Sequence, residues 1–370
     1  MNFTTVQGHV KSVAMKYLVT GASGHLGANL VRRLLQDNLD VRVLMRDKND
    51  VASIDGLKVE AVYGDLRDFA AVRKAMEGVD RVYHCAAKVS TTYGNEREIY
   101  DSNVVGTRHI LKAAREAKTG RVVVTGSFSA VGNLPDRPSD ETVPFYPFNK
   151  EMPYECSKAW VEHECWRAVL DHQQDVVVAT SCAIIGPYDF RPSRMGLVIR
   201  DFAHGKLRAY IPGGFEFVAA RDLVQGHLLT MEKGRTGQKY VFATEFRTLD
   251  EWMEMLEEVT GKKRPRLRLS PSLMYGIASV VSPILTRFFP NVPQRLTPGA
   301  VRILKLHRHA DTSKAKNELG YQPTSIKQAV QDAYDWFVDR GEIKEPRMNS
   351  NKQYDKLTLT TSSKGAGKAA

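Results

Sequence analysis

The chain has 370 residues, of which 42% are hydrophobic, enough to bury one large core or two smaller ones. Its net charge is +11, but the last 27 residues carry six Lys/Arg against two acidic residues, and the rest is spread thinly. With neither a dense basic patch nor a recognition motif, the sequence argues against nucleic-acid binding. Four scattered cysteines without C-x-x-C spacing or a metal-ligand pattern indicate no metal site and a reducing, cytoplasmic compartment.

Both ends of the chain differ in composition from the middle. Residues 1–14 lack the apolar core of a signal peptide, so we expect them to be a disordered extension ahead of Met15. Residues 343–370 are rich in Ser, Thr, Lys and Gly, and we expect a disordered basic tail there. The folded part is therefore predicted to lie within residues 15–342.

A glycine-rich turn follows the first apolar run. The run at 17–19 leads into Gly21, Gly24 and Gly27, and apolar residues at helical spacing follow to position 35. Strand, tight glycine turn and helix together let a pyrophosphate approach the backbone and the helix N-terminus. The spacing G-x-x-G-x-x-G differs from the dinucleotide-binding fingerprint G-x-G-x-x-G. Its position between a strand and a helix is nevertheless the one that this fingerprint requires. A glycine turn without a ligand therefore remains an alternative.

Alternating strands and helices continue through the first half of the chain. We expect strands at 17–19, 40–45, 57–63, 81–85, 121–125, 175–181 and 240–244, and helices at 28–35, 69–77, 99–118, 153–172 and 248–260. Several strands are apolar along their whole length, as in parallel sheets covered on both faces. The sequence therefore predicts an α/β fold with a Rossmann-type, doubly wound parallel sheet, which binds its ligand at the carboxyl ends of the strands.

The regular alternation weakens after residue 184. We expect a dinucleotide-binding domain over 15–184, to which 216–245 returns, and a smaller, mostly helical substrate-binding region over 185–342. The apolar stretch 273–289 contains a Gly and a Pro and is too short to span a bilayer. We expect it to form a buried helix pair. The alternative is an apolar lid or a peripheral membrane contact above a hydrophobic substrate.

A tyrosine and a lysine with acid–base potential follow the fifth strand. Tyr154 and Lys158 lie four residues apart in the predicted helix 153–172 and therefore on one face of it. A cation close to a phenol favours the phenolate and lowers its pKa, which would make Tyr154 able to exchange a proton with a carbonyl or alcohol oxygen. Thr125 and Ser127 end the preceding strand, where the ligand is expected.

Together these motifs resemble those of the extended short-chain dehydrogenase/reductases, especially the dihydroflavonol-reductase and 3β-hydroxysteroid-dehydrogenase-like branch. The resemblance covers roughly residues 16–340 in the family's order, and its pieces are TGASGHLG (20–27), GDLRD (64–68), HCAA (84–87), NVVGT (103–107), VVVTGSFSAVG (122–132), YECSK (154–158), IIGP (184–187), AARD (219–222) and DTSKAKNELGYQP (311–323). It implies an oxidoreductase of the NAD-dependent epimerase/dehydratase superfamily.

The resemblance also implies roles for individual residues. Tyr154 would be the proton donor, Lys158 its partner and a ligand of the nicotinamide ribose, and Ser127 the hydroxyl that binds the substrate oxygen, with Ser129 as the alternative because Gly126 replaces a serine often found there. Asn103 would be either catalytic or structural. The residues implied in cofactor binding are Gly21, Ser23, Gly24, His25, Leu26, Gly27, Arg46, Asp65, Leu66, Ala86, Ala87, Lys88, Thr125, Tyr154 and Lys158.

The preferred cofactor depends on the end of the second strand. NAD-binding relatives carry an acidic residue there, whereas this chain has Met45 followed by Arg46. Arginine suits the 2′-phosphate of NADP, which we favour. NAD remains an alternative, because Asp47 lies 20 residues after Gly27 and could take the acidic role.

The predicted function is hydride transfer between NADP(H) and a ketone, an aldehyde or a secondary alcohol. The alternatives are a nucleotide-sugar epimerase or dehydratase with the same Ser-Tyr-Lys triad and, more remotely, a non-catalytic redox sensor. We expect an apolar small-molecule substrate, and a homodimer remains open. The candidate residues for its pocket, in loop 186–215 and helices 270–305, are Met195, Phe215, Phe217, Met274 and Tyr275.

Overall fold

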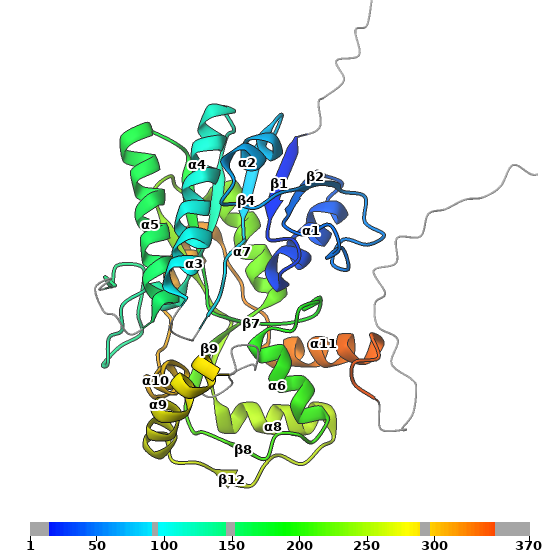
Figure 1. Cartoon of the computed structure of the whole chain (residues 1–370), viewed down its shortest axis with the longest axis vertical. Helices are drawn as coiled ribbons and strands as arrows, with labels where there is room; N and C mark the ends of the chain where they lie inside the picture. Colours follow the sequence, from blue (N-terminus) through cyan, green and yellow to red (C-terminus); the bar gives the residue numbers. More distant parts are fainter. Residues whose placement is uncertain (1–14, 91–94, 146–151, 289–296, 345–370) are drawn as a thin grey trace, which may run out of the picture.

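The computed structural model describes residues 15–90, 95–145, 152–288 and 297–344 (Figure 1). The predicted extension at residues 1–14 and nearly all of the predicted basic tail lie outside these ranges. Within them, no helix is long and apolar enough to cross a membrane.

A seven-stranded sheet forms the centre of the upper body in Figure 1, and every neighbouring pair in it is parallel. Its strands, in spatial order, are β10 (Lys239–Phe242), β6 (Val176–Ser181), β5 (Val122–Ser127), β4 (Arg81–His84), β1 (Lys16–Thr20), β2 (Asp40–Met45) and β3 (Glu60–Tyr63). The strand order reverses between β1 and β4, which confirms the predicted doubly wound sheet.

Helices cover both faces of this sheet, and a separate core lies on each face. They are α1 (His25–Gln36) and α7 (Ala220–Lys233) on one face, and α2 (Phe69–Met76), α4 (Gly106–Glu116) and α5 (Pro153–His172) on the other. Successive strand residues point to opposite faces, so Leu18 belongs to one core and Val19 to the other. This double burial explains the uninterrupted apolar runs in the sequence.

The predicted helix over 99–118 is divided into three segments. They are α3 (Glu96–Tyr100), a single π-helical turn η1 (Asp101–Val105) and α4. Apolar spacing reveals a helix but not one wider turn within it, so the sequence could not show this feature. Wider turns of this kind are frequent at functional sites, and here the turn contains the buried Asn103.

The C-terminal region forms a second body with its own core. A three-stranded sheet joins β7 (Ala183–Ile185), β9 (Gly214–Ala219) and β11 (Glu245–Thr248), and a short pair joins β8 (Ala209–Tyr210) and β12 (Leu267–Arg268). The helices around them are α6 (Arg194–Ala203), α8 (Leu249–Thr260), α9 (Pro271–Phe288), α10 (Pro298–Lys305) and α11 (Ile326–Asp339). The short π-helical turn η3 (Ala315–Leu319) packs instead against α7 and β10 of the large sheet. Between β9 and β11 the chain passes through β10, the edge strand of the large sheet.

The expectation of a buried helix pair at 273–289 is wrong. Residues 271–288 form one continuous helix, α9, with Pro283 inside it. Most of its large aliphatic side chains are exposed, including Leu273 at 60% and Val280 at 65%. Apolar composition alone suggested burial, whereas the side of α9 that packs against the protein carries small residues such as Ala278 and Ser282.

Helix α8 begins with the capping box that its sequence predicts. The Thr248 hydroxyl accepts a hydrogen bond from the Glu251 amide (3.2 Å), and the Glu251 carboxylate accepts one from the Thr248 amide (2.8 Å). These bonds satisfy two backbone donors that would otherwise be unpaired at the helix start. They also lower the pKa of Glu251.

We therefore predict that Thr248→Ala lowers the free energy of unfolding by about 1 kcal/mol, the usual loss when a side-chain cap is removed. Ser325→Ala is the matched control, because Ser325 precedes α11 without a side-chain cap bond to the residues that the structure describes. Denaturant titration of the two variants measures the difference. Equal losses would show that the capping box at α8 does not stabilise the protein.

Candidate active site

Ser127, Tyr154 and Lys158 lie together at the carboxyl end of β5. Ser127 ends this strand, its hydroxyl lies 2.7 Å from the Ser129 hydroxyl, and it is near enough to Tyr154 to act on the pKa of that side chain. Lys158 is buried one helical turn after Tyr154, and its ammonium donates a 2.6 Å hydrogen bond to the Thr125 carbonyl. The two predicted hydroxyl candidates, Ser127 and Ser129, are therefore bonded to each other.

The packing around position 126 explains why glycine, and not serine, precedes Ser127 in this strand. A Cβ atom at position 126 would lie 2.7 Å from the Thr180 hydroxyl and 2.8 Å from a Val178 methyl group on β6. Any side chain there would point into the packing between β5 and β6. It would not point toward Tyr154 as Ser127 does.

Asn103 joins the loop after β4 to the helix that carries Tyr154. Its amide oxygen accepts a bond from the Lys88 amide (2.7 Å), and its amide nitrogen donates to the Lys88 carbonyl and the Ser157 hydroxyl, each at 3.0 Å. The Ser157 hydroxyl donates in turn to the Tyr154 carbonyl (2.7 Å). This buried asparagine thus holds the start of α5 in place, and these contacts describe a structural role.

Burial dominates the ionisation of the two central side chains. It raises the pKa of Tyr154, while the hydrogen bond from Ser127 opposes this shift. It lowers the pKa of Lys158 to about 8. The sequence led us to expect that Lys158 would lower the pKa of Tyr154, but the charge of Lys158 is not among the causes of the shift. Its ammonium is directed at the Thr125 carbonyl instead.

The glycine turn between β1 and α1 leaves no room for side chains. Gly21 has φ +76°, and a Cβ atom there would lie 2.7 Å from the Ala86 backbone. A Cβ atom at Gly27 would lie 2.2 Å from the Gly21 carbonyl oxygen. Both positions therefore require glycine, one for its backbone conformation and the other for the close approach of helix and turn.

The N-terminus of α1 is suited to bind an anion. Gly24 precedes the helix and is exposed, and within the described residues no side chain caps it and no acidic residue occupies the first turn. Its free N–H groups and the helix dipole favour a phosphate there. Ser23 beside it is half-buried, whereas Leu26 is buried in the core behind the turn. The turn therefore fits the diphosphate of a dinucleotide.

His25 contacts the C-terminal region. Its Nε2 atom lies 3.1 Å from the carbonyls of Gly186 and Pro187, and burial lowers the pKa of the ring. Asn29 supports the same contact by donating to the Pro187 carbonyl (2.8 Å). The side chain of His25 thus fixes the loop after β7 against the glycine turn.

The remaining cofactor candidates line the loops at the same edge of the sheet. The carboxylate of Asp65 is held by Arg67 through two 2.8 Å side-chain bonds, which lower its pKa. Leu66 accepts a bond from His109 at its carbonyl (2.8 Å). The other predicted residues are Ala86, Ala87 and Lys88, which follow β4, and Arg46, which directly follows β2 and is exposed.

Two buried histidines brace the strand ends around the site. His84 bridges Thr20 (2.7 Å) and Thr107 (3.0 Å), and burial lowers its pKa to about 3. His227 on α7 lies 2.9 Å from the Thr125 hydroxyl, and burial lowers its pKa to about 4. Both rings are therefore neutral hydrogen-bonding spacers. Sequence reasoning missed them because their partners are distant along the chain.

Two arginines from the C-terminal region also reach the site. Arg302 on α10 forms a 2.7 Å ion pair with Glu155, next to Tyr154. Arg308 donates to the carbonyls of Phe128 (3.0 Å) and Val131 (2.6 Å), in the turn after Ser127. No local spacing signals these contacts, since their partners lie 147 to 180 residues away.

The predicted pocket residues divide into two groups. Phe217 is completely buried and packs against Trp252, so it belongs to the core. Met195, Phe215 and Met274 are partly buried against the same core, and Tyr275 is 45% exposed on α9. Within the described residues, no group of three or more His, Cys, Asp or Glu side chains could hold a metal ion.

Comparison with known proteins agrees with this geometry. The model of the NAD-dependent epimerase/dehydratase family matches residues 17–243. The chain belongs to this family of extended short-chain dehydrogenase/reductases. It is 47% identical over 331 residues to sterol demethylase protein B of Methylococcus capsulatus, covering 89% of this chain and all of that protein.

Two further similarities extend over most of the chain. The mouse sterol-4-alpha-carboxylate 3-dehydrogenase, decarboxylating, is 26% identical, with 86% of this chain and 90% of that protein covered. The crystal structure of gox2253 has a TM-score of 0.78 at 32% identity, with 89% of this chain and 99% of that chain covered. The chain is an NAD(P)-dependent oxidoreductase acting on CH–OH groups.

The buried ammonium of Lys158 gives a prediction for stability against pH. Its pKa of about 8 in the folded protein lies below the ordinary value of 10.5, so the unfolded chain binds more protons between these values. The free energy of unfolding of the wild type should therefore rise through this window relative to Lys158→Met, by up to about 3 kcal/mol.

Denaturant titrations at several pH values measure this difference. Lys58→Met is the control, because Lys58 is exposed and its removal reports the general effect of losing one lysine. Parallel stability curves for the wild type and Lys158→Met would contradict the burial of a charged ammonium at this position.

Proposed function

We propose that this protein is an NADP-dependent dehydrogenase that oxidises the secondary 3-hydroxyl of a sterol, with Tyr154 as general base. The observation that carries the proposal is that Ser127, Tyr154 and the buried Lys158 lie together at the carboxyl end of β5, where Lys158 donates to the Thr125 carbonyl and Ser127 opposes the rise in the pKa of Tyr154. The sterol is suggested by two relatives, sterol demethylase protein B and a decarboxylating sterol-4-alpha-carboxylate 3-dehydrogenase.

Each side chain has a distinct part in this proposal. The Ser127 hydroxyl and the deprotonated oxygen of Tyr154 bind the substrate hydroxyl, and the Tyr154 phenolate takes its proton while the carbon loses a hydride. NADP supplies the hydride acceptor when bound. Its diphosphate would lie at the N-terminus of α1, and Lys158 and Thr125 would lie beside its ribose. Because burial raises the pKa of Tyr154, the phenol is protonated at neutral pH, so alcohol oxidation should become faster as pH rises.

A carboxylate at C4 of the sterol would make the reaction decarboxylating. Oxidation of the 3-hydroxyl places a ketone β to this carboxylate. The bond between C4 and the carboxyl carbon then breaks, carbon dioxide leaves, and the electron pair forms an enolate that is protonated at C4. No further oxidant is needed for this second step. The word "decarboxylating" in the name of the mouse relative supports this substrate.

The experiment that tests the substrate class measures reduced nicotinamide and carbon dioxide together. A 3β-hydroxysterol 4α-carboxylate should yield both in equal amounts, and a 3β-hydroxysterol without the carboxylate should yield reduced nicotinamide alone. Turnover of a nucleotide sugar without net change of the cofactor would support the epimerase or dehydratase alternative instead.

We predict that Tyr154→Phe lowers turnover by about 10²–10⁴-fold, the usual contribution of general acid–base catalysis. Only a hydroxyl is removed, so the thermal midpoint and dinucleotide affinity should persist. Tyr210→Phe is the matched control, since it removes a hydroxyl that is bonded to Asp250 in the C-terminal region. Near-normal turnover of Tyr154→Phe on an accepted substrate would remove Tyr154 from the mechanism.

The preference for NADP is proposed to rest on Arg46. This exposed arginine directly follows β2, whereas the carboxylate of Asp47 accepts a 2.9 Å bond from the Asn49 amide. We predict that Arg46→Ala weakens NADPH binding by about 1–3 kcal/mol and barely changes NADH binding. Arg33→Ala removes a positive charge from α1 and serves as the control. Equal losses for both cofactors in titration experiments would favour Asp47 and NAD.

A further inference from the structure

The outer face of α9 is an apolar stripe at the surface. Leu273, Ile277, Val280, Ile284 and Phe288 follow one another at intervals of three or four residues, and their exposed fractions range from 41% to 69%. Seven of the sixteen large hydrophobic side chains that are exposed in the described part of the chain belong to this helix. Such clustering marks an interaction surface, because exposed apolar residues on ordinary surfaces are scattered.

The buried face of α9 differs in composition from its exposed face. Ala278 and Ser282 are buried, and Met274 packs against the C-terminal core. Helix α9 packs against α10. The larger aliphatic residues are therefore left outside, which reverses the usual pattern of a surface helix.

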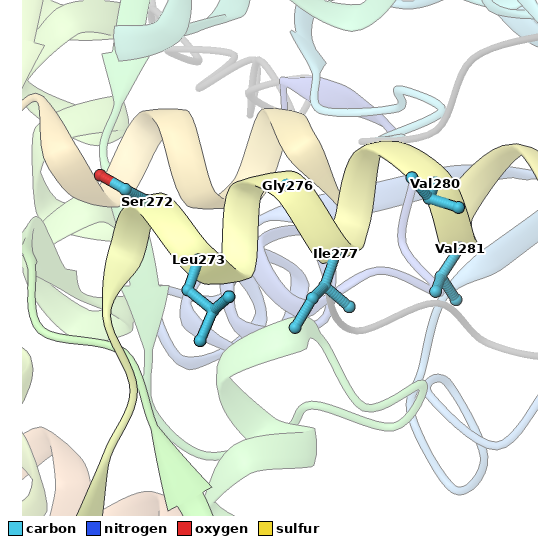
Figure 2. Close-up of a pocket in the computed structure, with 6 residues that line it drawn as sticks. All are labelled: Ser272, Leu273, Gly276, Ile277, Val280 and Val281. Carbon is cyan, nitrogen blue, oxygen red and sulfur yellow. The ribbon is translucent and has the colours of Figure 1, made fainter.

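A shallow, open hollow lies on this outer face. Its lining consists of Ser272, Leu273, Gly276, Ile277, Val280 and Val281. Figure 2 shows Leu273, Ile277 and Val281 pointing to the same side of the helix. In Figure 1, α9 lies at the edge of the C-terminal body, away from the large sheet.

The charged residues on both sides of this helix in the sequence are all positive. Residues 259–310 contain ten Lys/Arg and not one Asp or Glu. Five of these cations, at positions 262, 263, 264, 266 and 268, lie in the exposed segment immediately before α9. Arg264 and Arg268 pair with acidic residues of α8. The other three cations of the segment that precedes α9 in the sequence, Lys262, Lys263 and Arg266, are not in these pairs.

We propose that α9 and segment 262–268 form a docking surface for an anionic lipid bilayer. The helix would lie flat in the interface, with its apolar stripe among the acyl chains and the cations against the headgroups. A second copy of this chain fits less well, since a symmetric contact through α9 would bring two cationic segments together. Through α10 and its Arg302–Glu155 ion pair, the docked helix would lie two elements away from Tyr154.

Flotation of the full-length protein with vesicles tests this proposal. Binding to phosphatidylcholine vesicles containing phosphatidylglycerol should be strong at low salt and weaken as salt rises, while pure phosphatidylcholine should bind much less. Lys262→Gln and Lys263→Gln should each weaken binding about fivefold, the effect expected for one cation at an anionic surface. The double variant Val280→Asn/Ile284→Asn should abolish binding at every salt concentration.

The controls separate docking from misfolding and from self-association. Leu170→Asn removes an 80% exposed leucine from α5 and should leave vesicle binding unchanged. All variants should retain the wild-type thermal midpoint and dinucleotide affinity. Equal binding to both vesicle types, or no binding, would overturn the proposal. So would a dimer in sedimentation equilibrium that Val280→Asn/Ile284→Asn converts to monomer, because the stripe would then be a contact between copies.

Discussion

The candidate site depends on one buried cation. The ammonium of Lys158 is removed from water and donates to the Thr125 carbonyl, a group at the end of a central strand. An isolated charge in this position would cost several kcal/mol, and burial accordingly lowers the pKa of the lysine to about 8. The elements on both sides of the sheet must therefore hold Lys158 and the Thr125 carbonyl in position.

Several of the contacts around this arrangement are hydrogen bonds between segments far apart in the chain. Asn103 ties the π-helical turn to Ser157, and Ser157 ties in turn to the Tyr154 carbonyl. His227 holds the Thr125 hydroxyl from the opposite face of the sheet. Neutral imidazole and amide groups form these bonds, so these particular contacts add no buried charge. Contacts of this kind hold side chains in place before a ligand binds, which lowers the entropy lost on binding.

The C-terminal region combines two different surfaces. Toward the sheet it presents Arg302 and Arg308, which bond to the segments that carry Tyr154 and Ser127. On its outer side it presents the apolar stripe of α9 and the cations before it. An apolar substrate such as a sterol is scarce in water and concentrated in bilayers, so a lipid-facing α9, which packs against the helix that carries Arg302, would agree with the proposed function.

Much of this protein was determined by local sequence. Apolar runs with helices between them were sufficient for the doubly wound sheet, and the glycines, the Tyr154–Lys158 spacing and the Thr248 capping box were visible because each depends on neighbours within a few residues. Tertiary structure alone decided which way α9 faces, that burial and not Lys158 governs the pKa of Tyr154, and which distant residues brace the site. Exposure, desolvation and contacts across 100 or more residues are set by how whole elements pack, and no local pattern in the chain encodes that packing.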